Sequence, residues 1–391
     1  MPSAPASPSS GPPSSAGPAA SLEPAAIAEI ERQDAEIRLL EPRRTVETAM
    51  VDEAQAKVLL VDDFRTNNTP QNLADGELLL RGLGLWSTDR SLEEVYLSAL
   101  ESQVLGFYRD TDEKLYIVSR SGGFGPLERY TASHELTHAL QDQHFDLGSL
   151  GLDRKDQGDR ALAVRALVEG DASLVSTIWA QANLTLQDLL QVAAMASDPA
   201  AQAVLDGLPA IMREQLLFPY VDGLAFVTRL QQGGGWDAVN GAYGDLPAST
   251  EQILHPDKYL AGEKPIDVAL PDGLAGRLGP GWSKAAEDTL GELQLRVWLQ
   301  APGSTVDPKV AASDWGGDRV GLYRGPDGAW AIVLATAWDT AEASDRFAGA
   351  ALEAAGALPF AEVVSGGQGP VVLIGSDEAV LETLRLEALA P

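Results

Sequence analysis

The chain has 391 residues, of which 45% are hydrophobic and 22% are charged, a composition typical of soluble globular proteins with two or three domains. Its net charge of −29 argues against nucleic acid and anionic lipid surfaces as partners, because like charges repel. The absence of cysteine excludes disulfides and thiolate zinc sites, and no apolar run reaches the roughly 20 residues of a membrane helix.

Residues 1–25 are expected to form a disordered tether. The segment is dominated by Pro, Ser, Ala and Gly and has no charged side chain before Glu23, as in flexible linkers. It lacks the basic and apolar regions of a signal peptide. It is therefore either the tail of a cytoplasmic protein or the linker that follows a removed signal sequence or lipid anchor.

Order is expected to begin near Pro24, with a helix whose apolar residues recur at helical spacing as far as Leu40. Residues 74–101 predict two helices, and Ser91 with Glu94 forms a capping box at the start of the second.

Two β-prone runs within residues 104–119 flank a polar turn at 110–113 and predict a hairpin. A helix is expected to follow from Pro126 and to continue to about Gly148.

That helix contains the sequence HELTH, in which His134 and His138 are four residues apart and project from one face. Two imidazoles on adjacent turns can bind one metal ion, and Glu135 lies beside the first of them. The pattern His-Glu-x-x-His on a helix is a signature of zinc peptidases, in which the glutamate is the general base. The competing interpretation is a polar helix face whose histidines pair with nearby acids such as Asp142.

A catalytic zinc site needs a third protein ligand. The first candidate, Glu169, lies in a long apolar run of helical spacing, where an unpaired charge would be costly to bury. The competing interpretation of Glu169 is an ion pair with Arg165, one turn earlier on the same helix. The second candidate, His144, has the metzincin spacing, but Gln141 replaces the glycine that ends the helix in that pattern. Glu169 is therefore the preferred ligand.

The segments HELTHALQDQHFDL and ALVEGDASLV resemble the gluzincin class of zinc peptidases. More narrowly, they are similar to metallopeptidases found as surface proteins and lipoproteins of bacteria and archaea. The resemblance covers residues from about 26 to 391 and includes GFYRDTDEKLYIV, PASTEQILHPDKYLAGEKP and WGGDRVGLYRGPDGAWAIVLATAWDT. It implies that His134, His138 and Glu169 bind Zn²⁺ and that Glu135 is the general base.

The resemblance further implies hydrolysis of peptide or protein substrates by an endopeptidase or oligopeptidase reaction, outside the cell or on its surface. The alternative compartment is the cytoplasm. In gluzincins a later histidine or tyrosine often binds the developing oxyanion. His255 is the first candidate here, with Tyr243 and Tyr259 as alternatives, although a histidine before Pro256 is also an ordinary loop residue. The alternative function is a non-catalytic surface or adhesion protein that retains a structural zinc site.

The rest of the chain is expected to form the scaffold of the protein. Residues 184–246 are helical in pattern, with expected breaks at Pro199, Pro209, Pro219 and the glycines 233–235. Residues 263–282 predict a loop, and residues 284–300 predict a helix. A small β-β-α-β-α module is expected after Pro302.

The predicted fold class is therefore α+β. A zincin-like peptidase domain is expected at 26–302, with a small sheet, an edge hairpin, the zinc-site helix and a helical second half. A C-terminal α/β module is expected at 303–391.

Overall fold

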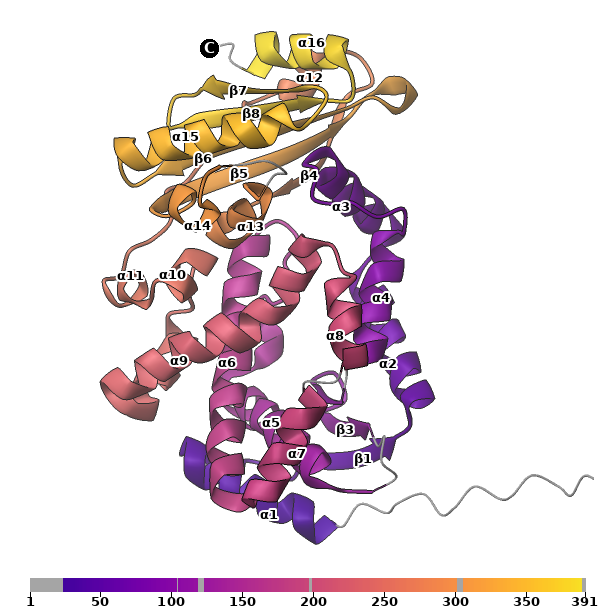
Figure 1. Cartoon of the computed structure of the whole chain (residues 1–391), viewed down its shortest axis with the longest axis vertical. Helices are drawn as coiled ribbons and strands as arrows, with labels where there is room; N and C mark the ends of the chain where they lie inside the picture. The colour runs from indigo at the N-terminus through magenta and orange to yellow at the C-terminus, as the bar shows by residue number, and fades with distance from the viewer. Residues whose placement is uncertain (1–23, 104, 119–122, 197–198, 301–304, 389–391) are drawn as a thin grey trace, which may run out of the picture.

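The computed structural model describes residues 24–103, 105–118, 123–196, 199–300 and 305–388. The fold is α+β, as predicted: a mostly helical N-terminal part holds a three-stranded sheet, and the C-terminal part is built on a five-stranded antiparallel sheet. Figure 1 shows the larger sheet at one end of the molecule and α1 at the other. The tether predicted for residues 1–25 lies outside the described residues as far as residue 23.

The N-terminal part contains, in chain order, α1 (Pro24–Arg38), β1 (Glu47–Val51), α2 (Glu53–Asn67), α3 (Pro70–Gly82), α4 (Leu92–Gln103), β2 (Gly106–Arg109), β3 (Lys114–Val118), α5 (Pro126–Phe145), η1 (Leu147–Ser149), α6 (Gly158–Asn183), α7 (Leu186–Ala196), α8 (Pro199–Asp206), α9 (Ala210–Gly244), α10 (Thr250–Leu254) and α11 (Pro256–Leu260). No helix among the described residues is long and apolar enough to cross a membrane.

The C-terminal part contains α12 (Leu274–Leu278), β4 (Ser283–Asp288), α13 (Gly291–Trp298), α14 (Pro308–Ala311), β5 (Trp315–Arg324), η2 (Pro326–Gly328), β6 (Trp330–Trp338), α15 (Ala341–Gly356), β7 (Ala361–Ser365), β8 (Pro370–Gly375) and α16 (Glu378–Ala388).

The small sheet has the order β1-β3-β2, with β1 parallel to β3 and β2 antiparallel to it. The predicted hairpin is confirmed as β2 and β3, and β2 forms an edge of the sheet. The capping box before α4 is also confirmed. The Ser91 N–H donates to Glu94 Oε2 over 2.9 Å, and the Glu94 N–H donates to Ser91 Oγ over 3.2 Å.

Helix α5 begins at Pro126, as predicted, but ends at Phe145 rather than near Gly148. Asp146 adopts the left-handed conformation with φ 54°, which stops the helix. The Asp142 side chain accepts the Leu147 N–H just beyond this point. An aspartate thus ends the helix where the sequence suggested a glycine.

Helices α6 and α9 cross at two glycines. A methyl group at Gly170 would lie 2.2 Å from the Gly223 carbonyl oxygen, and one at Gly223 would lie 2.2 Å from the Ala166 carbonyl oxygen. Only glycine therefore allows the two backbones to approach this closely. Figure 1 shows α9 crossing α6 near the middle of the N-terminal part.

The predicted helix break at Pro219 is wrong, since this proline lies inside α9. Packing stabilises the helix there, because Phe218 and Pro219 are both buried. The break predicted at residues 233–235 is confirmed as a kink, where Gly235 has a φ of 66°.

The C-terminal sheet has the strand order β4-β5-β6-β8-β7, and every neighbouring pair is antiparallel. Helices α13, α14 and α15 contribute to the core on one face, whereas α12 and α16 contribute to a second core. The predicted β-β-α-β-α order therefore missed two strands. Residues 283–288 form β4 rather than the start of a helix, and residues 361–365 form β7.

Charged groups join the N-terminal part to the C-terminal sheet at several places, and two of these groups are Lys258 and Asp288. In the first, the Lys258 ammonium lies 2.7 Å from Glu251, 2.7 Å from Glu263 and 2.5 Å from Asp339, which follows β6. In the second, Asp288 Oδ1 accepts the N–H of Gly158, the first residue of α6, over 2.6 Å. Burial raises the pKa of Asp288 to about 7.

Asp288 makes stability depend on pH. Because the folded protein holds this proton more tightly than the unfolded chain does, the stabilising contribution is present below about pH 4 and is lost as pH rises through about 7. Asp288→Asn keeps an acceptor oxygen and removes the charge. We expect the free energy of unfolding of this variant, relative to the parent, to rise by at least about 1 kcal/mol between pH 5 and pH 8.

Urea titrations at the two pH values measure this difference. Asp206→Asn is the control, because Asp206 is an exposed residue of α8. Parallel changes in Asp288→Asn and the parent would contradict the assignment.

Candidate metal centre

His134 and His138 on α5 and Glu169 on α6 bring three ligand atoms together. The Nε2 atoms of the two histidines are 3.2 Å apart. Glu169 Oε2 lies 3.2 Å from His134 Nε2 and 3.3 Å from His138 Nε2. The side chains are 14%, 11% and 19% exposed, so the group is mostly buried but accessible from outside. The structure therefore places all three predicted ligands around one point. We call these three residues the metal group.

The triangle fits a zinc ion. Ligand atoms roughly 2.0–2.1 Å from one ion, at tetrahedral angles, lie roughly 3.3–3.4 Å from one another, close to the observed separations. Two imidazole nitrogens and one carboxylate oxygen also form the donor set of one class of catalytic zinc site, which leaves the fourth position for water or substrate.

Charge inside the group is balanced by the carboxylate. Burial alone would lower the pKa of His138, but the neighbouring Glu169 carboxylate outweighs burial and raises this pKa to about 9. Conversely, burial would raise the pKa of Glu169, but His138 and His134 hold it well below its usual range. A divalent cation would replace the proton that this arrangement retains.

Gln141 orients His138. Its Nε2 donates to the Val168 carbonyl over 3.0 Å and to Asp171 Oδ2 over 3.1 Å. Its Oε1 therefore faces His138 Nδ1, at 2.8 Å, and accepts that proton. The Nε2 lone pair of His138 is then free for a metal, the usual role of such a partner. From the sequence alone, Gln141 is noticeable only because it stands at the position where the metzincin pattern has glycine.

Asp171 extends this network to α1 and α9. Its Oδ1 accepts Arg38 Nε over 2.7 Å, and its Oδ2 accepts the Tyr243 hydroxyl over 2.8 Å. Arg38 and Asp171 are completely buried. The sequence EGD at 169–171 thus combines a candidate ligand, the glycine of the helix crossing and the acid that accepts a hydrogen bond from Gln141. Tyr243, an alternative oxyanion partner from the sequence, has its hydroxyl bonded in this network instead.

Glu135 lies between the ligands and the edge strand. Its Oε2 accepts the Tyr108 N–H of β2 over 2.9 Å. A methyl group at Gly106 would lie 2.8 Å from Thr131 of α5, so β2 packs tightly against the helix. The Glu135 charge acts on both His138 and Tyr220. The predicted general base is therefore next to the metal group and next to the open edge of the sheet.

Tyr220 on α9 is a site residue that the sequence did not indicate. Its ring centroid is 6.1 Å from that of His134, and the residue is 49% exposed. The nearby Glu169 and Glu135 carboxylates raise the pKa of Tyr220 well above its usual value, so the hydroxyl keeps its proton. It follows Glu169 by 51 residues in the chain, and no local pattern links the two.

Three other predicted residues do not join the group. His144 Nε2 lies 2.9 Å from the Glu41 carbonyl oxygen, outside the ligand triangle. His255 Nε2 lies 3.1 Å from the buried Glu292, and its other polar contact is Arg296. Tyr259 donates its hydroxyl to the Asp245 carbonyl. The structure therefore gives His255 and Tyr259 contacts in the scaffold and does not bring them to the metal group.

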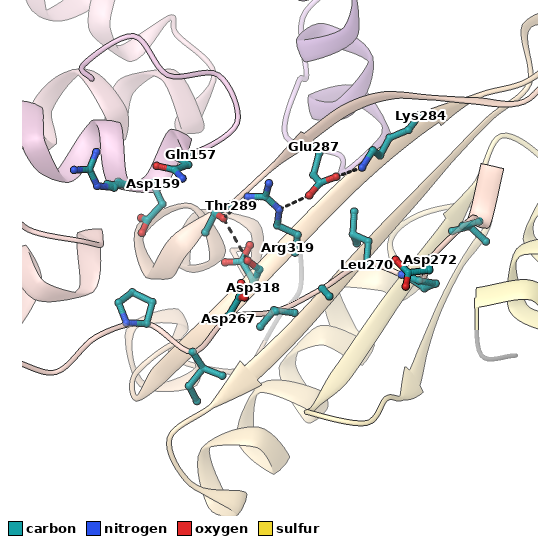
Figure 2. A pocket seen from close by; sticks show the side chains of 18 of the residues that line it. Gln157, Asp159, Asp267, Leu270, Asp272, Lys284, Glu287, Thr289, Asp318 and Arg319 are labelled. Atoms are coloured by element: carbon teal, nitrogen blue, oxygen red, sulfur yellow. Dashed lines mark hydrogen bonds and ion pairs between the residues drawn. The ribbon is translucent and has the colours of Figure 1, made fainter. Parts of the chain in front are cut away.

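A second acidic cluster and a cavity lie elsewhere. The cluster of Glu251, Glu263 and Asp339 holds the Lys258 ammonium at its centre. The cavity, of about 690 Å³, lies between the start of α6, residues 265–275 and the C-terminal sheet. Figure 2 shows Lys284 and Arg319 both paired with Glu287 on its wall. The cavity has no lining residue in common with the metal group.

The contacts rank three substitutions by their effect on zinc affinity. Gln141→Ala should weaken binding roughly 10–100-fold, because His138 loses its orienting partner. Glu169→Ala should weaken binding more, since it removes a ligand. His144→Ala should have little effect. Competition with a chelator measures all three, and greater loss in His144→Ala than in Glu169→Ala would overturn the assignment of ligands.

The comparisons with known proteins match only the C-terminal part. Residues 277–381 match the model of a domain of unknown function, DUF8575, which spans β4 to the start of α16. No curated protein and no solved structure shows a significant match to the chain.

Proposed function

We propose that this protein is a zinc-dependent peptidase, most simply an endopeptidase of the gluzincin type. The observation that carries the proposal is the ligand triangle of His134, His138 and Glu169 with Glu135 beside it. A donor set that leaves one coordination position open, next to a carboxylate that is not a ligand, is the arrangement of catalytic rather than structural zinc sites.

When bound, zinc would supply a Lewis acid that polarises the scissile carbonyl and favours ionisation of water near neutral pH. Glu135 accepts the proton of the attacking water and later delivers it to the leaving amine. The Tyr220 hydroxyl, kept protonated by Glu169 and Glu135, donates a hydrogen bond to the oxygen on which negative charge develops.

The substrate is a peptide bound in extended form. Leu105 O accepts the Val118 N–H of β3, and the alternation of an antiparallel pair then turns the main-chain groups of Gly106 and Tyr108 toward the open edge. Glu135 already accepts the Tyr108 N–H, so a peptide would bind there through the Gly106 groups and the Tyr108 carbonyl. Main-chain hydrogen bonds to such an edge are a general way of binding peptides. We place this activity outside the cell or on its surface, with a lipid anchor on the natural precursor as part of the same proposal.

One contact favours a second function. Because Tyr108 occupies one oxygen of Glu135, this carboxylate also fastens β2 to α5. A non-catalytic surface or adhesion protein would need Glu135 only for that purpose and would retain zinc for stability. The two functions differ in whether loss of the Glu135 charge abolishes hydrolysis.

Glu135→Gln tests the general base. The amide can still accept the Tyr108 N–H but cannot take a proton from water. We expect one zinc per chain in the parent and in the variant, with peptide hydrolysis in the variant at least 100-fold slower. Metal analysis and a peptide-library assay measure the two quantities. Equal hydrolysis by variant and parent would exclude Glu135 as the base, and no hydrolysis by either would favour the structural function.

Tyr220→Phe tests the oxyanion partner. The ring that lies near His134 is retained and only the hydroxyl is lost. We expect kcat to fall roughly 10–1000-fold while KM and zinc content change little, because the hydrogen bond forms mainly in the transition state. Tyr259→Phe is the matched control. An unchanged kcat in Tyr220→Phe would remove Tyr220 from the mechanism.

A further inference from the structure

The cavity of about 690 Å³ lies where the start of α6 meets the segment 265–275 and the C-terminal sheet. Its size is within the range of small-ligand pockets, roughly 300–1000 Å³, and such pockets often lie where two parts of a protein meet. Strands β4 and β5, which line it, belong to the matched region of unknown function. Figure 2 shows Gln157 at one end of the cavity, Asp272 at the other and Arg319 between them.

The segment 265–275 is held against β5, so the cavity is preformed. The Ile266 N–H donates to the Gly316 carbonyl oxygen over 2.6 Å. A methyl group at Gly321 would lie 2.6 Å from Leu270 Cδ1, so this leucine packs directly on the backbone of the strand. A ligand that enters a preformed cavity pays less ordering entropy than one that must assemble its site.

Tyr323 of β5 contributes a polar group that has no partner in the protein. The residue lines the cavity and is 3% exposed, yet its hydroxyl forms no hydrogen bond with any residue that the structure describes. Burial above all raises the pKa of Tyr323 to about 12, so the hydroxyl stays protonated and can donate. A buried hydroxyl in this condition calls for a water or a ligand as its partner.

The side of the cavity formed by α6, β4 and β5 carries an excess of positive charge. Arg319 Nε lies 2.7 Å from Glu287, and Lys284 pairs with the same carboxylate, so two cations share one acid. Arg160, in the first turn of α6, is partly buried and forms no ion pair within the described ranges of the chain. An anionic group therefore finds a favourable place here, in a protein whose net charge is −29.

The segment 265–275 carries the opposite charge. Asp267 and Asp272 both line the cavity, are exposed and form no ion pair with a described residue. Two other acids of the lining already have partners. Asp159 accepts a hydroxyl and a main-chain N–H, and Asp318 accepts two main-chain N–H groups and an indole N–H. The cavity thus has one basic and one acidic side.

We propose that this cavity binds a short peptide as a zwitterion, with its C-terminal carboxylate against Arg160 and its N-terminal ammonium against Asp267 and Asp272. The Tyr323 hydroxyl donates to a main-chain carbonyl between the two ends. Such a ligand complements both sides at once, whereas a simple anion or cation would face like charge on one of them. The inference goes beyond the proposed function, because no residue of the cavity belongs to the metal group.

The test compares the tripeptide Ala-Leu-Ala with its N-acetylated and C-amidated forms by titration calorimetry on the full chain. A chelator in the buffer removes zinc, so that hydrolysis does not consume the probes. We expect the parent to bind the free tripeptide at least about tenfold more tightly than either blocked form, because each block removes a charged hydrogen-bonding group.

Substitutions on the two sides assign the two ends of the peptide. In Arg160→Gln the preference for the free over the amidated form should fall below about threefold, while the preference over the acetylated form is kept. The double variant Asp267→Asn, Asp272→Asn should show the reverse. Arg154→Gln is the matched control, because Arg154 also precedes the body of α6 but pairs with Asp156 and does not line the cavity.

Tyr323→Phe is an independent variant that keeps the buried ring and loses only the hydroxyl. It should weaken the binding of all three probes by a similar factor, roughly threefold to tenfold, because the hydroxyl contacts the main chain and not the ends. Unchanged affinities in this variant would overturn the placement of the peptide beside Tyr323.

Other outcomes would overturn the site itself. These are equal affinity of the parent for the three probes, no binding, tighter binding of the amidated form, or the parent's preferences retained in Arg160→Gln. Zinc-loaded Glu135→Gln separates the cavity from the metal group. An affinity equal to that of the chelated parent supports the cavity, whereas binding seen only with zinc would assign the peptide to the metal group and leave the proposed function standing.

Discussion

The close crossing of α6 and α9 at Gly170 and Gly223 is the constraint on which the rest of the site depends. It fixes the distance between a helix that carries Glu169 and one that carries Tyr220. A side chain at either glycine would meet backbone atoms at 2.2 Å, so the helices would have to separate. The glycine next to the ligand therefore determines the geometry of the site as directly as the ligand itself.

A buried ion pair extends this rigidity around the metal group. Arg38 and Asp171 are both fully buried, and the Arg38 guanidinium lies over the Trp236 ring at 4.6 Å from its centroid. Removing two charges from water is costly, and apolar residues of similar volume often replace such a pair without loss of stability. What they cannot replace is the acceptor for Gln141. The network thus lowers stability but fixes the orientation of the His138 ring. Hydrogen-bond partners of metal-binding histidines commonly have this orienting role.

The parts of this structure that the sequence predicted depend on neighbours in the chain. The spacing of His134 and His138, the capping box at Ser91 and the hairpin at β2 and β3 are all local patterns. Glu169 could be predicted as a ligand because a carboxylate in an apolar helix needs a partner. Its partners are the two histidines, and the predicted alternative, Arg165, interacts with it only electrostatically.

The parts that the sequence missed depend on packing between distant segments. Tyr220 lies near His134 because α9 crosses α6. His255, the residue that the resemblance favoured for this role, bonds to Glu292 instead. Strand β4, with the sequence SKAAED, has no apolar alternation. It is a strand because β5 pairs with it. Such elements cannot be recognised before their neighbours are known.

The Lys258 cluster has a consequence for the joint between the two parts of the chain. Three carboxylates converge there as they would around a calcium ion, but the cation is covalently part of the protein. The joint therefore needs no divalent metal, and a chelator would leave it intact. Its vulnerability is of another kind: a reagent that acylates the amine would leave three acidic groups facing one another at the base of the C-terminal sheet.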